Sequence, residues 1–350
     1  MRTETIAVRV LRSVLLPILV LGMAVASAQD STIVLKYASL DKPDAIIGRG
    51  QDWYLKRVEE RSGGRVKFDR YWSDTLVPAR QIIEALNSGV VDAGFLIPSF
   101  YPARLPLINI GTLPTTNEAT YAFFMAMKDL IEQVPAVREE LTRAGIRYLT
   151  SSSFPAYYPI MREPMRSLDD FKGRKVRGLG SQLVLLKTLG AAAVSMPTPE
   201  VYTALERGTI DGAIYPPLLV VDFGLHGAAK HLWKMPIASN VSLLVMSQRS
   251  WGRLPPAVQK IMEEAAVEHA VAYHRIVHAE GNEKEAVSKL KAQGVIITES
   301  SDAEKARLRK LAEPIWQDWI KEMDGKKLPG QQVADTFRKL LEKHSASVPQ

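Results

Sequence analysis

The residue types that most often carry enzyme chemistry are sparse in this chain. Its 350 residues include no cysteine, which removes thiol nucleophiles, cysteine-ligated zinc and iron–sulfur clusters. His274 and His278 are four residues apart and His269 lies about one turn earlier, but the His-Glu-x-x-His pattern of zinc proteases is missing. We therefore expect surface histidines, no metal site and no catalytic residues.

Glycines and carboxylates give no catalytic motif either. Gly178-Leu179-Gly180 lacks the third glycine of a dinucleotide-binding loop, and the sequence has no phosphate-binding loop and no nucleophile elbow. The paired carboxylates Asp169-Asp170 are most simply charges at the start of a helix. The sequence thus predicts no cofactor.

The elements that surround these residues alternate between strands and helices. This order predicts α/β units with mostly parallel sheets and covering helices. Hydrophobic periodicity predicts strands at 32–38, 66–71, 90–97, 146–150, 241–248 and 295–298, and two further α/β units within 168–215. Helices are expected at 48–61, 79–87, within 116–144, at 302–322 and 331–343, and as one unbroken pattern over 255–292. Residues 151–167 are expected to be largely irregular.

One short pattern occurs in each half of the chain. Residues 85–93 and 204–212 both read Ala-Leu-x-x-Gly-x-x-Asp followed by a small residue. Each predicts a helix that ends at a left-handed glycine and is followed directly by a strand. A match this short can be convergent, but its position favours two similar lobes over one large sheet.

The first 28 residues have the features of a secretory signal peptide. A basic start with Arg2, Arg9 and Arg12 precedes an apolar stretch that ends at Ala26-Ser27-Ala28. We expect cleavage after Ala28 and a periplasmic mature protein; an uncleaved anchor is the alternative. Cleavage removes three arginines and Glu4, which lowers the net charge of +7 by two to +5. Because basic and acidic residues alternate in the rest of the chain, we expect no nucleic-acid partner.

The segment from 164 to 212 carries an ordered series of motifs. It contains Phe171-Lys172-Gly173-Arg174-Lys175-Val176-Arg177, then Gly190-Ala191, then Glu200-Val201-Tyr202-Thr203-Ala204-Leu205 and Asp211-Gly212. This series resembles the DctP-type substrate-binding proteins of tripartite ATP-independent periplasmic (TRAP) transporters. The resemblance implies two α/β lobes in a Venus-flytrap arrangement, a cleft between them, and a long helix that spans both.

The resemblance also assigns a role to Arg177, which matches the residue that binds the ligand carboxylate in this family. Physical reasoning agrees, because Arg177 ends a predicted strand, α/β sheets bind ligands beyond such ends, and a guanidinium can hold a carboxylate with two hydrogen bonds. An ion pair between lobes or on the surface is the alternative. Other expected ligand-binding residues are aromatic or carry hydroxyl groups: Tyr215, Tyr157, Phe100, Thr198, Ser181 and Ser99.

The aromatic candidates replace positions at which the family often carries polar residues. We therefore expect a monocarboxylate with an apolar or aromatic body, not a sialic acid or a small dicarboxylate. The expected lobes are 29–154 with about 243–282, and 155–242 with about 283–335, followed by a helix end and tail at 336–350. The expected protein is a monomer that delivers its ligand to TRAP membrane subunits. An exported α/β enzyme acting on a carboxylate, or the ligand-sensing subunit of a receptor, are the alternatives.

Overall fold

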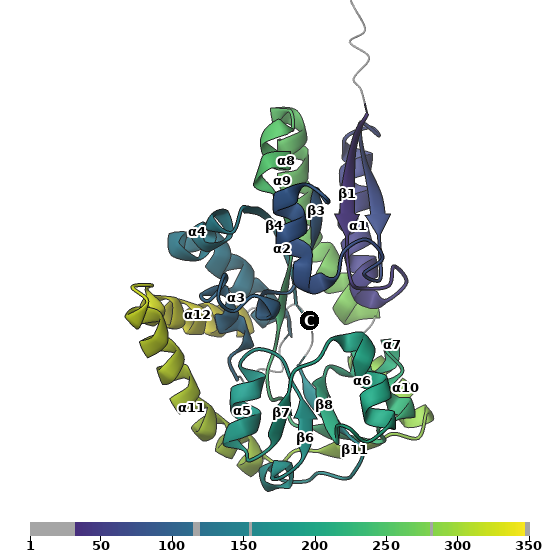
Figure 1. The fold of residues 1–350 in the computed structure, drawn as a ribbon, viewed down its shortest axis with the longest axis vertical. Coiled ribbons are helices and arrows are strands. Elements are labelled where there is room, and N and C mark those ends of the chain that lie inside the picture. The colour runs from purple at the N-terminus through teal and green to yellow at the C-terminus, as the bar shows by residue number, and fades with distance from the viewer. Residues whose placement is uncertain (1–31, 115–119, 154–155, 281–282, 347–350) are drawn as a thin grey trace, which may run out of the picture.

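The computed structural model describes residues 32–114, 120–153, 156–280 and 283–346. Within these residues the chain forms two α/β lobes, each built around its own sheet (Figure 1). This is the two-lobed α/β fold that the sequence predicts. The expected signal peptide lies outside the described residues.

The sheet of the first lobe contains segments from both halves of the chain. Among the described residues its strand order is β2-β1-β3-β10-β4. The strand β1 is parallel to β2 and β3, whereas β10 is antiparallel to β3 and β4. The bounds are β1 Ile33–Ala38, β2 Val66–Tyr71, β3 Ala93–Leu96, β4 Ile146–Ser153 and β10 Val241–Ser247.

The sheet of the second lobe has the order β11-β9-β5-β8-β6-β7 in the described chain. Its bounds are β5 Tyr158–Met161, β6 Lys175–Arg177, β7 Ala192–Val194, β8 Gly212–Tyr215, β9 His231–Lys234 and β11 Ile296–Glu299. The expectation that 151–167 is largely irregular was wrong at β5, which is buried between β8 and β9. The strand contains Pro159, and because proline is rare in central strands, the sequence argued against this assignment.

The helices flank the two sheets, and α8 and α9 return to the first lobe after α5, α6 and α7 of the second (Figure 1). The helices of the first lobe are α1 Ile46–Arg61, α2 Ile82–Ser88, α3 Thr120–Gln133, α4 Pro135–Arg143, α8 Gln248–Arg253 and α9 Pro256–His274. Those of the second lobe are α5 Gln182–Thr188, α6 Thr198–Glu206, α7 Pro217–Asp222 and α10 Glu283–Ala292. Short 3-10 turns occupy Ala79–Gln81, Pro98–Phe100, Ile108–Thr112, Leu168–Phe171 and Leu225–Gly227.

The repeated pattern of the sequence has the same structure in both lobes. Gly89 and Gly208 are left-handed, with φ of 80° and 69°, as predicted for glycines that end helices. The aspartates that follow tie neighbouring strands together: Asp92 accepts a hydrogen bond from the backbone of Lys36 at 2.9 Å, and Asp211 accepts one from Lys175 at 2.7 Å. The pattern thus sets where β3 and β8 begin.

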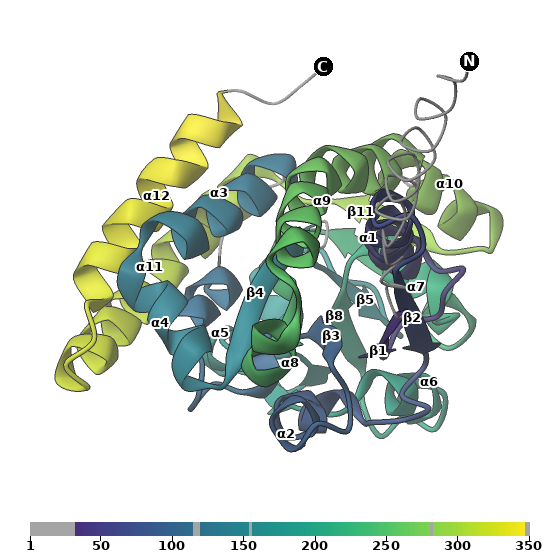
Figure 2. The same ribbon diagram turned by 90° about the horizontal axis from the view of Figure 1, so that it is seen from above.

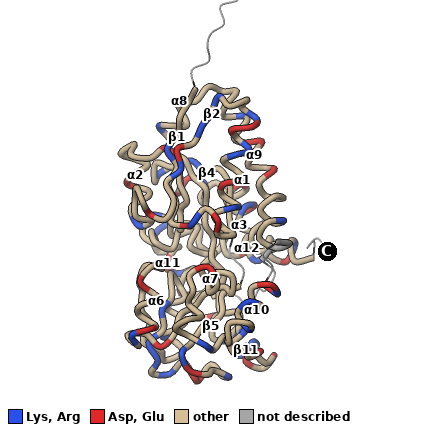
Figure 3. The backbone as a smooth tube through the Cα atoms, turned by 90° about the vertical axis from the view of Figure 1, so that its right-hand side faces the viewer, with Lys and Arg blue, Asp and Glu red and all other residues tan. Residues whose placement is uncertain are grey.

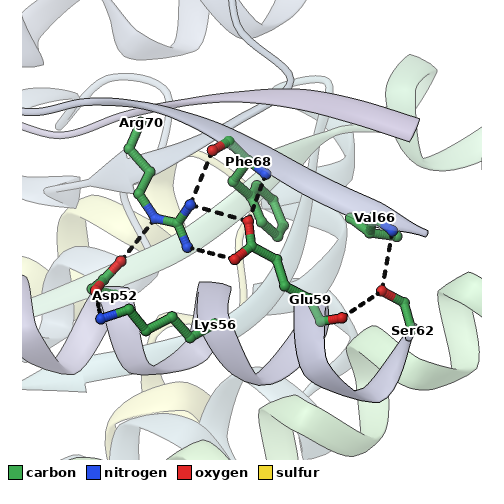
Figure 4. Close-up of polar contacts among 7 residues, drawn as sticks. All are labelled: Asp52, Lys56, Glu59, Ser62, Val66, Phe68 and Arg70. Atoms are coloured by element: carbon green, nitrogen blue, oxygen red, sulfur yellow. Dashed lines mark hydrogen bonds and ion pairs between the residues drawn. The ribbon is translucent and has the colours of Figure 1, made fainter. Parts of the chain in front are cut away.

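A partly buried ion-pair network fastens the edge strand β2 to helix α1 (Figure 4). The guanidinium of Arg70 lies between Asp52 and Glu59, with distances of 2.8 Å from its Nε to Asp52 and 3.0 Å from its Nη1 to Glu59. Glu59 also accepts the backbone N–H of Phe68 at 2.9 Å, and these bonds hold its pKa below the ordinary value. The network fixes α1 against the edge of the sheet.

The helical pattern predicted over 255–292 is helical in the described residues from Pro256 onward, with a change of helix type after His274. α9 packs on the first lobe, residues Arg275–Glu280 form a π-helical turn, and α10 packs on α7 of the second lobe. A π turn holds more residues than an α turn, so it changes which side chains face inward. The sequence pattern predicted one continuous helix; the structure describes α9 with its π turn up to Glu280 and α10 from Glu283, and residues 281–282 lie outside the described residues.

The end of the chain returns to the first lobe. α11, Asp302–Gly325, leads from the second lobe to α12, Gly330–Ser345, which runs alongside α3 (Figure 2). Phe337 of α12 packs between Phe123 and Trp316, and His344 lies 2.9 Å from the carboxylate of Asp129. The second half of α12 is thus packed against α3.

Charged residues of both signs are distributed over both lobes. Lysines and arginines lie among aspartates and glutamates along the visible side of the molecule (Figure 3). Of the described helices, none combines the length and the apolar character needed to cross a bilayer.

Candidate functional site

The carboxyl ends of parallel strands bring candidate residues of the two lobes together. Arg177 and Tyr215 are the last residues of β6 and β8, and Thr198 follows β7 at the start of α6. In the first lobe, Ser99 follows β3. The lobes touch here, because a Cβ placed on Gly180 of the second lobe would lie 3.3 Å from the Cβ of Ser99. Parallel α/β sheets bind ligands at such ends.

Arg177 is fully buried, with 0% of its surface exposed. Its Nε and Nη2 donate to the backbone oxygen of Met196 at 3.3 Å and 3.2 Å, and its guanidinium carbon lies 4.6 Å from the centre of the Tyr215 ring. The third nitrogen, Nη1, has no hydrogen-bond partner among the described residues, and no described carboxylate forms an ion pair with Arg177. A buried cation without a counter-charge is costly. The site therefore has the properties needed to bind an anion.

The ring of Tyr215 lies against this guanidinium, and Tyr157 is near enough for the charge of Arg177 to act on its hydroxyl. The hydroxyl of Tyr215 donates to Thr198 Oγ1 at 3.1 Å. Burial raises the pKa of Tyr215 and of Tyr157, and the positive charge of Arg177 opposes the rise in both. Tyr157 also receives a hydrogen bond from Asn240, which in turn donates to Ser99 Oγ at 3.5 Å. Arg177, Tyr215, Tyr157, Thr198 and Ser99 thus form one cluster that includes both lobes.

Comparison with known proteins identifies the family. Residues 38–322 match the family model described as "Bacterial extracellular solute-binding protein, family 7", or DctP. The chain belongs to the DctP family.

Several relatives of this DctP protein are characterised or solved. It is 26% identical over 330 residues to the ectoine-binding periplasmic protein TeaA of Halomonas elongata, covering 91% of this chain and 92% of TeaA. A TRAP solute-binding protein from Rhodoferax ferrireducens, solved with copurified benzoate, has a TM-score of 0.83 at 24% identity, covering 90% of this chain and 99% of that one.

A second solved structure is a marine metagenome TRAP protein specific for aromatic acid ligands, in complex with metahydroxyphenylacetate. Its TM-score is 0.81 at 23% identity, covering 89% of this chain and 99% of that one. Both structural likenesses concern the fold of the two lobes. They agree with the Venus-flytrap arrangement that the sequence predicts.

Of the remaining two candidates of this DctP protein, Ser181 lies in a contact between the lobes and Phe100 packs against a residue that makes such a contact. Ser181, which precedes α5, bonds to the backbone oxygen of Thr112 in the first lobe, and its Oγ lies 3.0 Å from Thr112 Oγ1. The ring of Phe100 packs under Arg80, whose guanidinium carbon lies 4.4 Å from the ring centre. Arg80 reaches Ser195 Oγ of the second lobe at 3.5 Å. In this conformation Ser181 holds the lobes together directly, and Phe100 supports Arg80, which does so.

The expectation of surface histidines was wrong for His269. It is fully buried, with Nδ1 3.1 Å from Thr150 Oγ1 and Nε2 3.2 Å from the backbone oxygen of Gly50. Burial lowers its pKa from 6.5 to about 4, so it is a neutral core residue that joins α9 to α1 and β4. The side chain of His278 lies outside the described residues.

Sequence reasoning missed two buried polar residues near strand ends, of which Asn240 contacts the cluster through Ser99. Asn240 precedes β10, and Asp41 follows β1 in the loop that leads to α1. Both are buried polar residues next to an apolar strand, a position where a buried side chain needs a partner. Their position at the end of a strand could have marked them as candidates, but the sequence did not show that they are buried.

Proposed function

We propose that this protein binds a monocarboxylate with an apolar or aromatic body between its lobes and delivers it to TRAP membrane subunits. The observation that carries the proposal is the buried Arg177, whose Nη1 lacks a partner in the described chain. A ligand carboxylate bound there would supply the missing charge and accept hydrogen bonds from a fixed fork. The carboxylate therefore sets the orientation of the ligand.

The body of the ligand is inferred from the aromatic rings around the guanidinium. Tyr157 and Tyr215 are both almost fully buried and both lie close to Arg177. A flat apolar body can pack against such rings, whereas a sugar acid would leave several hydroxyl groups to be satisfied. Benzoate and metahydroxyphenylacetate, which occupy the two structural relatives, are ligands of this kind.

Binding is coupled to closure of the lobes in this proposal. Contacts such as Thr112 with Ser181 and Arg80 with Ser195 join the lobes near the Arg177 cluster. Closure around the ligand excludes water and so strengthens the ion pair with Arg177. The closed complex is then the form that docks on the membrane subunits, and the ligand leaves unchanged. The lobe boundaries at about 154, 242 and 282 belong to this proposal.

Export is a further part of the proposal. The basic and apolar sequence of residues 1–28 supports cleavage after Ala28 and a periplasmic protein that begins at Gln29. Sequencing the N-terminus of protein recovered from the periplasm tests this. A chain that keeps Met1 or remains in the membrane fraction would contradict it.

The binding proposal is tested by calorimetry with protein freed of ligand by unfolding and refolding. We expect benzoate to bind, and Arg177→Ala to weaken binding by about 2–5 kcal/mol, because its loss leaves the ligand charge buried and unpaired. Arg174→Ala is the matched control: Arg174 lies three residues earlier and donates to the backbone oxygens of Glu163 and Pro164. Benzoate affinity of the Arg177→Ala variant within twofold of wild type would refute the role of Arg177.

A further inference from the structure

A groove lies between the lobes on the side of the molecule along which α11 runs (Figure 1). Its volume of about 260 Å³ is near the lower end of the range of small-molecule sites. Residues within 102–113 of the first lobe, within 180–184 of the second lobe, and within 315–323 of α11 line it. α11 contacts both lobes, because it packs against α5 and its Trp316 Nε1 donates to the backbone oxygen of Pro114 at 3.0 Å. The groove therefore has this shape only while the lobes keep their present positions.

The walls of the groove are mostly apolar. Pro106 and Leu113 come from the first lobe, Val184 comes from α5, and Trp319 and Met323 come from α11. Val184 is 49% exposed, so an apolar side chain of the second lobe is open to solvent here. A ring or a short alkyl chain bound in the groove would remove this apolar surface from water. The walls thus suit a small molecule with an apolar body.

The hydroxyl and amide groups of the groove can accept hydrogen bonds but have already donated their own protons. Thr112 Oγ1 donates to the backbone oxygen of Asn109 at 2.8 Å, and Ser181 Oγ donates to the backbone oxygen of Thr112. The amide nitrogen of Asn109 donates to the backbone oxygens of Pro98 and Leu105 at 3.0 Å and 2.7 Å, while its Oδ1 has no partner among the described residues. A ligand that forms hydrogen bonds to these side chains therefore has to be the donor.

The charges at the groove are negative. Asp318 and Glu322 are exposed one turn apart on α11, and no lysine, arginine or histidine of the described chain lines the groove. Lys326 neutralises Glu322, with 2.6 Å between its Nζ and Glu322 Oε1. Asp318, in contrast, forms no ion pair within the described residues. The neighbouring Trp319 adds an indole ring, whose face attracts cations. The groove thus favours a positively charged group.

We propose that this groove is a second binding site, which takes a small organic cation that consists of an ammonium group and an apolar body of about one ring. The ammonium group only donates hydrogen bonds, and its charge is complementary to Asp318. The body covers Val184 and Trp319. Because both lobes line the groove, the bound cation stabilises their present positions and thereby raises the affinity for the carboxylate ligand. This coupling, but not the site itself, rests on the proposed function.

Calorimetry with 2-phenylethylamine, which is a cation at neutral pH, tests the site. We expect wild type to bind the amine with a Kd below about 1 mM, and to bind 2-phenylethanol, an uncharged molecule of the same shape, about tenfold more weakly. Asp318→Asn should weaken amine binding by about threefold, because it removes an exposed charge partner. Asp335→Asn is the matched control: Asp335 is exposed on α12, where it accepts a hydrogen bond from Gln331 at 2.9 Å, and this variant should keep the wild-type affinity for the amine.

Repeating the titrations with the other ligand present tests the coupling. Saturating benzoate should raise the affinity for the amine by about threefold or more, and the amine should raise the affinity for benzoate by the same factor, because coupling between two sites is reciprocal. Weaker amine binding in the presence of benzoate would mean that the two molecules compete for the site at Arg177, and would overturn the second site.

The other outcomes separate the second site from the proposed function. The site is also overturned if the amine does not bind below about 1 mM, if the alcohol binds as tightly as the amine, or if Asp318→Asn leaves the amine affinity unchanged. If the amine binds as expected but benzoate does not bind, the proposed ligand class fails and the second site stands. If both molecules bind without affecting each other, the site stands and its coupling to the carboxylate ligand is overturned.

Discussion

At the scale of single residues, the Arg177 side chain makes two kinds of interaction at once. Part of its guanidinium is satisfied by the oxygen of Met196, its face lies on the ring of Tyr215, and Nη1 has no described partner. The ring and the backbone oxygen hold the group in one orientation. A binding site of this kind is preorganised, so less ordering remains to be done when a ligand arrives.

Two substitutions of Tyr215 distinguish the contribution of its ring from the contribution of its hydroxyl group. Tyr215→Phe removes the bond to Thr198 but leaves the ring on the guanidinium, so we expect a loss of about 1 kcal/mol of stability and carboxylate affinity within about threefold of wild type. Tyr215→Leu also removes the cation–π contact and should weaken binding by about tenfold. Calorimetry and urea denaturation of both variants measure these effects. Equal affinities for the two variants would show that the ring does not position Arg177.

The sequence located part of this cluster. Arg177, Tyr215 and Thr198 lie in the segment with the ordered motifs, and the structure brings them together. Asn240 was missed because its partner Ser99 is 141 residues away in the sequence. Asp41 was missed because its partner Gln51 lies in α1, on the far side of the loop that follows β1. No local pattern predicts such pairs.

At the scale of elements, strands and helices with strong periodicity were predicted and short buried ones were not. The βα units around Gly89 and Gly208 follow from their turn chemistry. In contrast, α7 has six residues, and β5 contains a proline, so neither has a readable period. The π turn after His274 packs against α1, and hydrophobic periodicity does not encode such a local change of helix type.

The loop between β6 and α5 gives a prediction at this scale. Gly180 has φ of +53°, and a Cβ there would lie 3.0 Å from Thr112 Oγ1 and 3.3 Å from the Cβ of Ser99 in the other lobe. Gly180→Ala should therefore hold the lobes apart and weaken carboxylate binding by about tenfold, in addition to a backbone cost of about 1 kcal/mol in stability. Calorimetry and thermal unfolding measure the two effects.

Gly173→Ala provides the matched control for this variant. Gly173 has a comparable φ of +76°, but a Cβ there meets nothing within 4 Å. It should show the same backbone cost with unchanged affinity. If Gly180→Ala and Gly173→Ala bind the ligand equally well, the contact between Gly180 and the first lobe does not limit closure.

At the scale of the whole molecule, three buried groups hold unusual protonation states. Burial raises the pKa of Asp41 and of Glu140 to about 7, and lowers that of His269 to about 4. Glu140 of α4 accepts the backbone N–H groups of Leu107 and Ile108 at 2.7 Å and 3.0 Å. Between about pH 4.5 and 6.5, the folded protein keeps protons on both carboxyls, whereas the unfolded chain keeps a proton on the histidine.

The difference in bound protons fixes the sign of the pH dependence. With these three groups, the folded state binds about one proton more than the unfolded state near pH 5.5, so the free energy of unfolding falls by about 1.4 kcal/mol per pH unit as the pH rises. Glu140→Gln removes one of the two protonated carboxyls, so the contributions of Asp41 and His269 should nearly cancel and the slope should flatten.

Urea denaturation at pH 5.0, 5.5, 6.0 and 6.5 measures this slope in the two proteins. Glu140→Gln should also be less stable than wild type at pH 5.0 by about 1–3 kcal/mol, because a glutamine amide cannot accept both backbone N–H groups. Glu139→Gln, at the exposed neighbouring position of α4, is the control and should keep the wild-type slope. Parallel curves for wild type and Glu140→Gln would show that Glu140 is ionised in the folded protein, and that its two backbone hydrogen bonds outweigh its burial.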